Sequence, residues 1–480
     1  MKMLINGHQV DASDGRVIEV TNPYNNVLLD TVPAATREDV KSAIDAAVVG
    51  QRRWADRTVR DRACVIKKFV ALMRENRDDI ALTLCRETGK PLSDAYGEVD
   101  ECCYIFEGSI EVVKHHYGAT MPMGTQPGYD DDLQVTIHEP LGVIVCIIPF
   151  NFPVALWAYK AGPALMAGNA IITKPASHNP LAVMKCCQLL VEAGVPGSIC
   201  SCVTGSGSTT GEWLVDDPRV AQVNLTGGVE AGKSIAATAA RHLTDCKFEL
   251  GGNDPVIICA DADMDLAVRE SEDRTRNAGQ CCSGSKRFIV HNSIKDEFVK
   301  RLITEILETK VMGDPTDPHT TLGTVISESA AKKIEQQIAL TVRQGAHLIY
   351  GGERKGAFIK PAVLMDVTKD MDIARDMEIF GPVYPIIGFD TIEEAIQIAE
   401  SSNYGLGGGV ITSNLNTAMK VASALKTGHV AINASGSFRA VELPFGGGKK
   451  NSGNSRESLF SVLSEVTHTK SIIFRYAMKK

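Results

Sequence analysis

The chain has 480 residues, of which 44% are hydrophobic and 22% charged, and its formal net charge is −8. That length allows about two to four domains with large cores, and the composition is that of an ordinary globular protein. The acidic balance argues against a nucleic-acid-binding surface, which needs a basic patch, although a few local arginines can still attract an anionic small molecule.

Cysteine usage bears on metals and on the cellular compartment. The chain has 13 cysteines, and three pairs of them are adjacent: Cys102-Cys103, Cys186-Cys187 and Cys281-Cys282. No Cys-x-x-Cys pair occurs, so we expect no metal site. The N-terminal residues lack the apolar segment of a signal peptide. We therefore expect a reduced, cytoplasmic protein.

In chain order, residues 37–111 show helical spacing, and residues 119–138 form an extended, hairpin-type segment with prolines, glycines and an acidic run. Strand-like and helix-like segments alternate after that. Such alternation predicts a doubly wound α/β architecture. The predicted strands are 141–148, 170–173, 199–203, 220–225, 255–259 and 288–290, and the clearest predicted helices are 155–167 and 182–193.

Residues 140–159 carry no charge, and a stretch of this length can suggest a membrane span. Pro149, Asn151 and Pro153 interrupt it, however, and proline breaks a helix interior. A strand, a tight turn and a helix explain the stretch better, so we expect no membrane association.

Cys282 ends the segment 277–282, in which small residues and a glutamine precede two adjacent thiols. The pattern is typical of a tight loop that presents a thiol, and a thiolate is a strong nucleophile toward a carbonyl carbon. Core packing is the more common role of a free cysteine, and the segment alone leaves both interpretations open.

Two further segments carry groups suited to carbonyl chemistry. Glu249 lies among a phenylalanine, a leucine and two glycines, where partial desolvation would raise its pKa and make it a better base. Asn151 follows a buried strand, at the edge of a parallel sheet where ligands collect. An amide N–H directed at a developing oxyanion contributes about 3–4 kcal/mol. An inert strand-end glutamate and a turn-forming asparagine are the alternatives.

Polar groups suited to a nucleotide occur in two more segments. Lys174 directly follows a strand and can bind ribose hydroxyls or a phosphate. Glu378 stands beside Phe380 and a Gly-Pro turn.

These five segments, in this order, closely resemble the aldehyde dehydrogenase superfamily over essentially the whole chain. The resemblance implies that Cys282 attacks an aldehyde, that hydride leaves to a nicotinamide, and that water hydrolyses the resulting thioester. It also implies an oxyanion hole from Asn151 and the Cys282 backbone N–H, and a water-activating role for Glu249. The remaining implied roles are proton relay for Lys160 and Glu457, ribose contacts for Lys174 and Glu378, and nicotinamide packing for Phe380.

The resemblance further implies an aldehyde dehydrogenase-like fold of two doubly wound α/β domains and a small β oligomerisation hairpin. We expect a dinucleotide-binding domain at 1–118 and 139–249, a catalytic domain at 250–457, and an oligomerisation segment at 119–138 and 458–480. Members of the family assemble as homodimers or homotetramers.

Residues 227–234 fit the phosphate-loop pattern G-x-x-x-x-G-K-S and follow a predicted strand, so a nucleoside triphosphatase is a remote alternative. It leaves the other motifs unexplained. The same stretch, from Thr226 through Gly227 and Gly228, resembles the family's cofactor loop, which opens a helix near the pyrophosphate. Gly205 lies in a second cofactor-loop candidate.

Ser177 occupies a position where family members often carry a glutamate that binds the adenosine ribose and repels a 2′-phosphate. Because serine is neutral and short, we expect NADP to be accepted, with NAD as an alternative or second cofactor.

Arg276 and Arg439 match the substrate tunnel of the family, and two arginines there would suit an anionic aldehyde. Either arginine could instead pair with an internal carboxylate. Tyr159 stands where succinate-semialdehyde members carry another arginine, so small hydroxyaldehydes such as lactaldehyde remain possible. A coenzyme A-acylating semialdehyde dehydrogenase is the main alternative, although that branch typically lacks the glutamate found at position 249.

A crystallin-like structural role is a third class of function, and it would leave the chain without activity on any aldehyde. Cys281 could protect Cys282 during oxidation, although packing is its plainer role.

Overall fold

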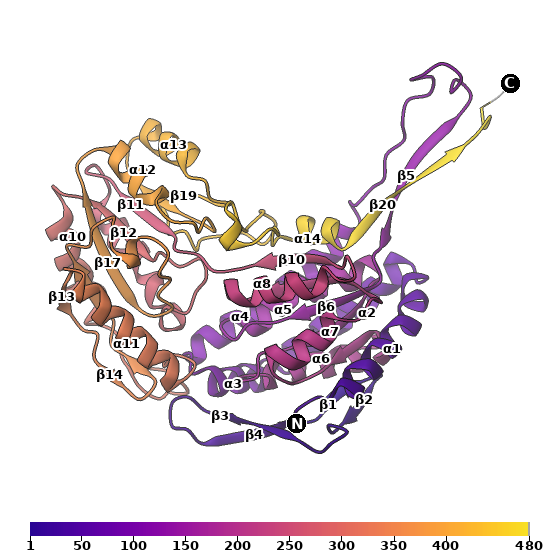
Figure 1. Ribbon diagram of the computed structural model, residues 1–480, viewed down its shortest axis with the longest axis horizontal. Helices are drawn as coiled ribbons and strands as arrows, with labels where there is room; N and C mark the ends of the chain where they lie inside the picture. Colours follow the sequence, from indigo (N-terminus) through magenta and orange to yellow (C-terminus); the bar gives the residue numbers. More distant parts are fainter. Residues whose placement is uncertain (479–480) are drawn as a thin grey trace.

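The computed structural model describes residues 1–478, which form two α/β bodies and a projecting two-stranded ribbon (Figure 1). Each of the six predicted strands and the two predicted helices is present, with ends shifted by no more than two residues. The predicted doubly wound α/β class is therefore confirmed.

The first body is built on a seven-stranded sheet of order β10-β9-β6-β7-β8-β1-β2. The five strands from β10 to β8 run parallel, and β6 and β7 at the centre are fully buried because helices cover both faces. The antiparallel edge formed by β1 and β2 was not predicted. The strands are β1 (Met3–Ile5), β2 (His8–Val10), β6 (Val143–Ile147), β7 (Ala170–Lys174), β8 (Cys200–Cys202), β9 (Val220–Thr226) and β10 (Asp245–Glu249).

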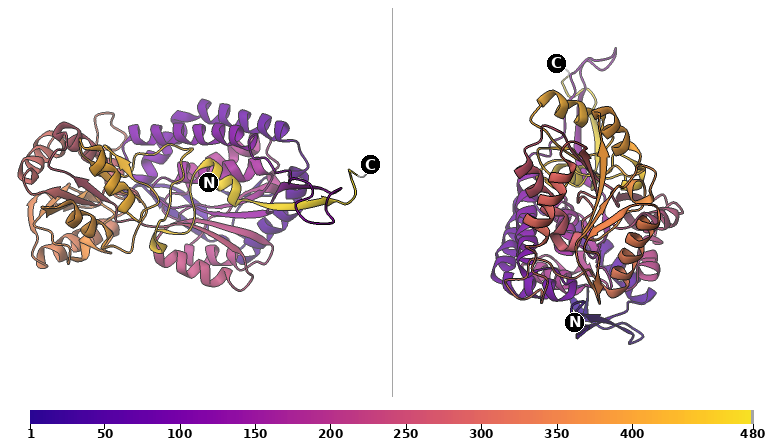
Figure 2. Two further views of the ribbon diagram at one scale, coloured as in Figure 1. Left: turned by 90° about the horizontal axis from the view of Figure 1, so that it is seen from above. Right: turned by 90° about the vertical axis from the view of Figure 1, so that its left-hand side faces the viewer.

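Helices lie on both sides of this sheet (Figure 2, left). One face carries α5 (Pro153–Ala167) and α6 (Leu181–Glu192), which are covered in turn by α2 (Val59–Glu75), α3 (Arg77–Thr88) and α4 (Leu92–Val113). The other face carries α1 (Arg37–Ala55), α7 (Glu212–Val215) and α8 (Val229–Ala239). The predicted helical region 37–111 is thus four helices, and Pro153 begins α5, where its missing N–H is tolerated.

The second body has a seven-stranded sheet of order β13-β16-β17-β12-β11-β18-β19. Alternate residues of its strands point to opposite faces, which separates two apolar cores. The strands are β11 (Pro255–Ile258), β12 (Arg287–His291), β13 (His347–Tyr350), β16 (Ala362–Met365), β17 (Val383–Phe389), β18 (Gly409–Ile411) and β19 (Ala431–Ile432). The helices are α9 (Met264–Ser271), α10 (Lys295–Arg301), α11 (Glu328–Arg343), α12 (Ile392–Glu400) and α13 (Leu415–Ala424).

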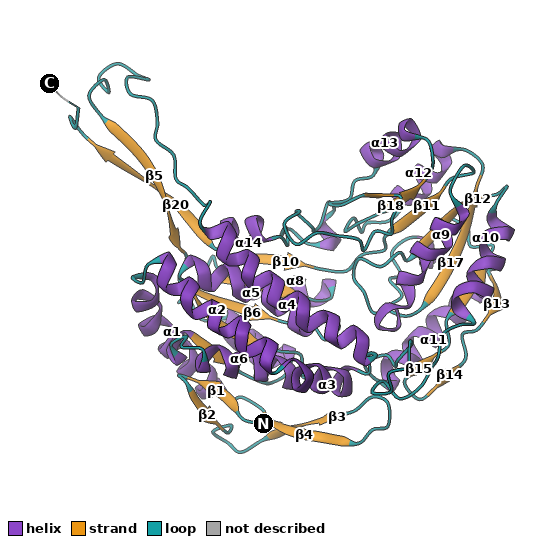
Figure 3. Cartoon of the chain, turned by 180° about the vertical axis from the view of Figure 1, so that it is seen from behind, coloured by secondary structure: helices purple, strands orange, loops and turns teal. Residues whose placement is uncertain are grey.

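The hairpin β3 (Val17–Thr21) and β4 (Leu28–Pro33) joins the two bodies at one end, where the ring of Tyr24 meets that of Phe358 edge-on at 5.9 Å. A short hairpin of β14 (Arg354–Lys355) and β15 (Phe358–Ile359) completes the contact (Figure 3).

The ribbon pairs β5 (Leu133–Pro140) with β20 (Thr467–Phe474) in antiparallel register over the full length of both strands. The predicted hairpin-type segment 119–138 contributes a loop that runs back along β5, with a bridge between Thr120 and Val135. The preceding helix α14 (Leu459–Glu465) packs on α4 and α5 within the first body. The domain boundaries and the homodimer or homotetramer stay predictions.

No helix within residues 1–478 is long and apolar enough to cross a membrane. The uncharged stretch 140–159 forms β6, a turn and the start of α5.

Arg62 ties α2 to the helices on either side of it. Its buried guanidinium donates to the carbonyls of Met166 at 3.1 Å, Ala55 at 3.1 Å and Arg57 at 2.5 Å. Because these carbonyls close the ends of α1 and α5, the arginine satisfies acceptors that the helices leave unpaired.

Replacing Arg62 with methionine should lower the free energy of unfolding by about 2–4 kcal/mol, because buried carbonyls lose their donors. Chemical denaturation measures the change. Arg60→Met is the matched control on the same helix, since its side chain is 85% exposed. Equal stability of the two variants would contradict this role of Arg62.

Candidate active site

The predicted site residues meet where the carboxyl edge of the first sheet faces the amino end of the second. Lys174 and Glu249 end β7 and β10, and Cys282 and Glu378 lie in the loops before β12 and β17. A cavity of about 440 Å³ lies at this junction, and Cys282 and Glu378 line it, whereas Lys174 and Glu249 are not among its lining residues. Its lining includes Asn151, Thr226, Gly227, Gly228, Leu250, Gln280, Cys282, Glu378 and Phe380.

The loop before Cys282 has an unusual backbone. Asn277, Ala278 and Gly279 have φ values of 49°, 52° and 75°, in the left-handed region that non-glycine residues rarely adopt. Gly279 also touches the backbone of Gly381, and an added Cβ would lie 2.2 Å from its carbonyl carbon. Surrounding contacts must hold this strained loop in place.

Several buried donors and acceptors supply those contacts. Arg274 donates to the carbonyls of Gly279 at 3.1 Å and Ile379 at 2.6 Å, which joins the Cys282 loop to the Glu378 loop. The Gln280 side chain donates to Asn277 O at 3.1 Å and accepts from Ile326 N at 2.9 Å. The loop is therefore fixed on both sides before it reaches the thiol.

Cys282 is half-buried, and a lysine anchors its backbone. Lys286 Nζ donates to Cys282 O at 2.5 Å, to Gly252 O at 2.7 Å and to Glu378 Oε1 at 2.9 Å. A hydrogen bond with the Cys281 thiol and burial raise the pKa of the Cys282 thiol well above its usual range.

Cys281 faces away from this cavity, into a small apolar cluster with Phe152 and Leu156. Its Sγ lies 3.5 Å from Ser283 Oγ. Cys282, in contrast, lines the cavity.

Asn151 is buried and held at both ends. Its Nδ2 donates to Gln280 O at 3.1 Å, while its own carbonyl accepts from Lys90 Nζ at 2.7 Å and Asn277 Nδ2 at 2.8 Å. A primary amide has two N–H donors, so one remains available toward the cavity that Asn151 shares with Cys282.

Glu249 is 4% exposed, and neither carboxyl oxygen has a hydrogen-bond partner within residues 1–478. Burial and the nearby Glu457 carboxylate raise the pKa of Glu249 well above its usual range. The carboxyl group packs against Gly446, where an added Cβ would lie 2.3 Å from Oε1. At φ +140°, position 446 also favours glycine on conformational grounds.

Two cations flank Glu457, which is itself buried. Lys160 Nζ lies 3.3 Å from Glu457 Oε1 and 2.7 Å from Thr226 Oγ1. Arg439 Nη1 lies 3.3 Å from Glu457 Oε2. Glu249, Glu457 and Lys160 are buried and, with the half-buried Arg439, form one cluster of two carboxyl groups and two cations.

The residues expected to bind a cofactor lie along the same edge of the first sheet. Burial lowers the pKa of Lys174 to about 8. Ser177 is half-buried, and its Oγ donates to Gly205 O at 2.8 Å. Phe380 meets Phe150 edge-on at 5.8 Å across the cavity.

The cavity fits a dinucleotide at the start of α8. Gly228 precedes this helix without a side-chain cap, so the first backbone N–H groups are open to an anion. A Cβ built on Gly228 would meet no atom within 4 Å, which leaves room for a ligand.

The phosphate-loop alternative finds no support. Residues 229–231, which would wrap the phosphates, already belong to α8. Lys233 is exposed and pairs with Glu230 at 2.9 Å. Within residues 1–478, no group of three His, Cys, Asp or Glu side chains is placed to hold a metal ion.

Arg276 and Arg439 line a second cavity of about 740 Å³. The exposed Arg276 guanidinium lies 5.0 Å from the ring centre of Phe152. Arg439 stacks on Tyr159 and Phe445 at 4.5 and 4.4 Å, and its Nε and Nη2 have no hydrogen-bond partner within the described chain. Arg439 pairs with Glu457, as the alternative interpretation anticipated, but it keeps donors free.

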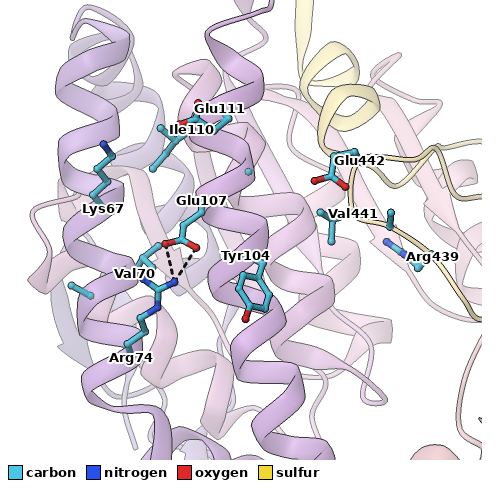
Figure 4. Close-up of a pocket in the computed structure, with 13 residues that line it drawn as sticks. Lys67, Val70, Arg74, Tyr104, Glu107, Ile110, Glu111, Arg439, Val441 and Glu442 are labelled. Atoms are coloured by element: carbon cyan, nitrogen blue, oxygen red, sulfur yellow. Dashed lines mark hydrogen bonds and ion pairs between the residues drawn. The ribbon is translucent and has the colours of Figure 1, made fainter.

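Arg439 also borders a groove of about 840 Å³ between α2, α4 and the loop 439–442 (Figure 4). An ion pair between Arg74 and Glu107 links the two helices, and Val441 and Glu442 lie opposite them. The groove contains none of the residues that line the Cys282 cavity.

Sequence inspection missed Lys90, Glu98, Arg274 and Lys286, which hold the Asn151 and Cys282 segments. Isolated charges in a sequence indicate exposed positions, whereas all four side chains are buried here. The one sequence feature that could have indicated a buried cation is Lys286-Arg287, which directly precedes an apolar strand.

Comparisons with known proteins agree with this geometry. The aldehyde dehydrogenase family matches residues 10–472. The NADP-dependent succinate-semialdehyde dehydrogenase GabD of Escherichia coli K12 is 36% identical over 459 residues, which cover 95% of this chain and 93% of that protein.

Solved structures of dehydrogenases are also similar to this chain over nearly its whole length. Betaine aldehyde dehydrogenase from Staphylococcus aureus, in complex with NAD+, superposes with a TM-score of 0.95 at 33% identity and covers 99% of this chain and 95% of its own. 3,6-Anhydro-L-galactose dehydrogenase superposes with a TM-score of 0.94 at 32% identity, covering 98% and 99%. The predicted aldehyde dehydrogenase-like fold is confirmed, and the chain belongs to the aldehyde dehydrogenase family.

Proposed function

We propose that this protein oxidises a small polar or anionic aldehyde to its carboxylic acid with NAD(P)+, using Cys282 as the nucleophile. The observation that carries the proposal is the placement of Cys282 and the Asn151 amide on one cavity. The relatives named above support the cofactor, since they include an NADP-dependent enzyme and a complex with NAD+.

In the first step the Cys282 sulfur attacks the aldehyde carbon, the thiol proton passes to solvent water, and the carbonyl oxygen becomes an oxyanion. The free N–H of Asn151 and the backbone N–H of Cys282 donate to that oxygen. Each such donor contributes about 3–4 kcal/mol to transition-state stabilisation. The Lys286 ammonium lowers the pKa of Cys282 and so opposes the effect of burial.

Lys174, Ser177, Glu378 and the N-terminus of α8 would hold the dinucleotide, with Phe380 beside the nicotinamide. When bound, NAD(P)+ supplies a hydride acceptor for the carbon attached to Cys282. Loss of hydride leaves a thioester on the enzyme.

Glu249 then takes a proton from water, whose oxygen attacks the thioester carbon. The C–S bond breaks, the acid leaves, and the sulfur regains its proton. A raised pKa suits Glu249 to this task because a stronger base accepts a proton more readily. The contact between Lys160 and Glu457 supports a role for these two residues in passing the proton on. Glu249 favours hydrolysis over transfer to coenzyme A, which stays the alternative.

Arg276 and Arg439 line the same cavity, which supports an anionic group on the substrate. Most carboxylates of the same cavity already accept hydrogen bonds from the protein: Asp94 from Asn277 N, Glu270 from Ser435 N, and Asp273 from Ser437 Oγ. These hydrogen bonds use part of the acceptor capacity of the carboxylates.

A reducing, cytoplasmic setting belongs to the proposal, because a thiol nucleophile must stay reduced. All 13 cysteines are unpaired in the structure.

The wild-type protein should oxidise succinic semialdehyde with a lower KM than butanal, measured as NAD(P)H absorbance. Cys282→Ala should abolish both reactions, because no other thiol lines the cavity within the described residues. Arg276→Met should raise the KM for succinic semialdehyde by about tenfold, with little change for butanal, because it removes one charged hydrogen-bonding partner.

Cys281→Ala is the matched control and should keep its activity. Activity retained in Cys282→Ala would refute the proposed nucleophile. Acyl-coenzyme A formed as fast as the free acid would refute hydrolysis instead.

Glu457→Gln should move the rise of kcat with pH to lower pH. Glu249 acts as a base only when deprotonated, and the Glu457 charge raises its pKa, so removing that charge lets Glu249 ionise at lower pH. The measurement is a pH profile of kcat. Glu442→Gln, at an exposed position, should leave the profile in place. A shift to higher pH in Glu457→Gln would contradict the coupling.

Ser177→Glu should lower kcat/KM for NADP by about tenfold or more while sparing NAD, because a carboxylate repels the 2′-phosphate. Ser177→Gln, of similar size but neutral, separates charge from bulk. An absolute preference of the wild type for NAD would contradict the expected NADP use.

A further inference from the structure

Lys90 and Glu98 form an ion pair that is completely buried. Lys90 lies between α3 and α4, Glu98 lies on α4, and Nζ is 2.5 Å from Oε2 with both side chains 0% exposed. Removing two charges from water is unfavourable unless further hydrogen bonds satisfy both groups. The other hydrogen-bond partners of Lys90 and Glu98 therefore identify the segment that the ion pair keeps in place.

Those partners all belong to residues 151–155. Lys90 Nζ donates to Asn151 O at 2.7 Å and lies 4.4 Å from the ring centre of Phe152. Glu98 Oε1 accepts from Val154 N at 2.8 Å and Ala155 N at 3.3 Å. The pair thus forms hydrogen bonds both to the turn that carries Asn151 and to the first turn of α5.

This turn lacks means of its own to hold its shape. Pro149 and Pro153 have no N–H to donate, and Phe152, at the start of α5, has no side chain that could cap the helix. Glu98 supplies the missing cap. Lys90 fixes the backbone carbonyl of Asn151 and so the position from which the Asn151 side chain extends.

We infer that the Lys90–Glu98 pair is a positioning pair that sets the Asn151 amide for the oxyanion. The inference rests on the proposed role of Asn151. A small displacement of that amide weakens its hydrogen bond in the transition state more than it weakens substrate binding, so the loss falls on kcat.

The test replaces both residues, as Lys90→Met with Glu98→Gln, which leaves no unpaired buried charge. The glutamine oxygen can still accept from Val154 N, but the donor to Asn151 O is gone. We expect kcat to fall by about tenfold, with KM for the aldehyde and for NADP changed by less than about twofold. Unchanged kcat in this folded variant would overturn the inference.

The same two replacements in an Asn151→Ala background complete a double-mutant cycle. If the pair acts through Asn151, kcat should fall no further there, whereas the thermal stability should fall in both backgrounds. A further tenfold loss of kcat without Asn151 would overturn the inference. Full activity of Asn151→Ala alone would instead refute the proposed oxyanion donor.

Arg77→Met with Asp100→Asn is the matched control. That pair also joins α3 to α4, at 2.6 Å, but it is half-exposed and touches no residue of the turn. Its removal should leave kcat unchanged. Should the Lys90→Met, Glu98→Gln protein not fold, Lys90→Arg in the same cycle keeps the charge but moves the donor from Asn151 O. We then expect Lys90→Arg to lower kcat by the same factor in protein that keeps Asn151, and to have no further effect in Asn151→Ala.

Discussion

The arrangement of the segments around the cavity depends most on the hydrogen bonds of the Lys286 ammonium group. It binds the carbonyls of Gly252 and Cys282 and the carboxylate of Glu378, so one charge joins three segments that are distant in the sequence. Gly252 belongs to the crossing from the first body to the second, Cys282 to the loop before β12, and Glu378 to the loop before β17. The lysine is itself buried, so its charge is satisfied by these three acceptors and not by bulk solvent.

Around this point the protein uses buried charge in two different ways. Lys90 with Glu98 and the guanidinium of Arg274 hold backbone groups in place, and their partners satisfy them. Glu249, in contrast, is buried, and its oxygens have no hydrogen-bond partner among residues 1–478. A satisfied buried charge stiffens a structure, whereas an unsatisfied carboxyl group is poised to take up a proton. The contrast separates the groups that shape the cavity from the group proposed to do chemistry beside it.

The sequence indicated the parts of the fold and site that are encoded locally. The strands that precede Asn151 and Lys174 are continuous apolar runs, and the Cys282 segment is contiguous, so each could be recognised without knowledge of its neighbours. Partners brought together by folding could not be recognised in this way. Lys90 meets Asn151 only because α3 and α4 pack beside α5, and no pattern near either residue encodes that contact.

The pairing of β5 with β20 has a consequence for the order in which the protein matures. Strand β5, from the first third of the chain, pairs with residues 467–474 near the end of the described chain. Helix α14, which follows Glu457, completes the core of the first body. Residues 457–474, which follow the second body in the sequence, supply the buried Glu457, a helix of the first body's core and the partner of the projecting strand. The first body can therefore complete its fold only after the second body has been synthesised.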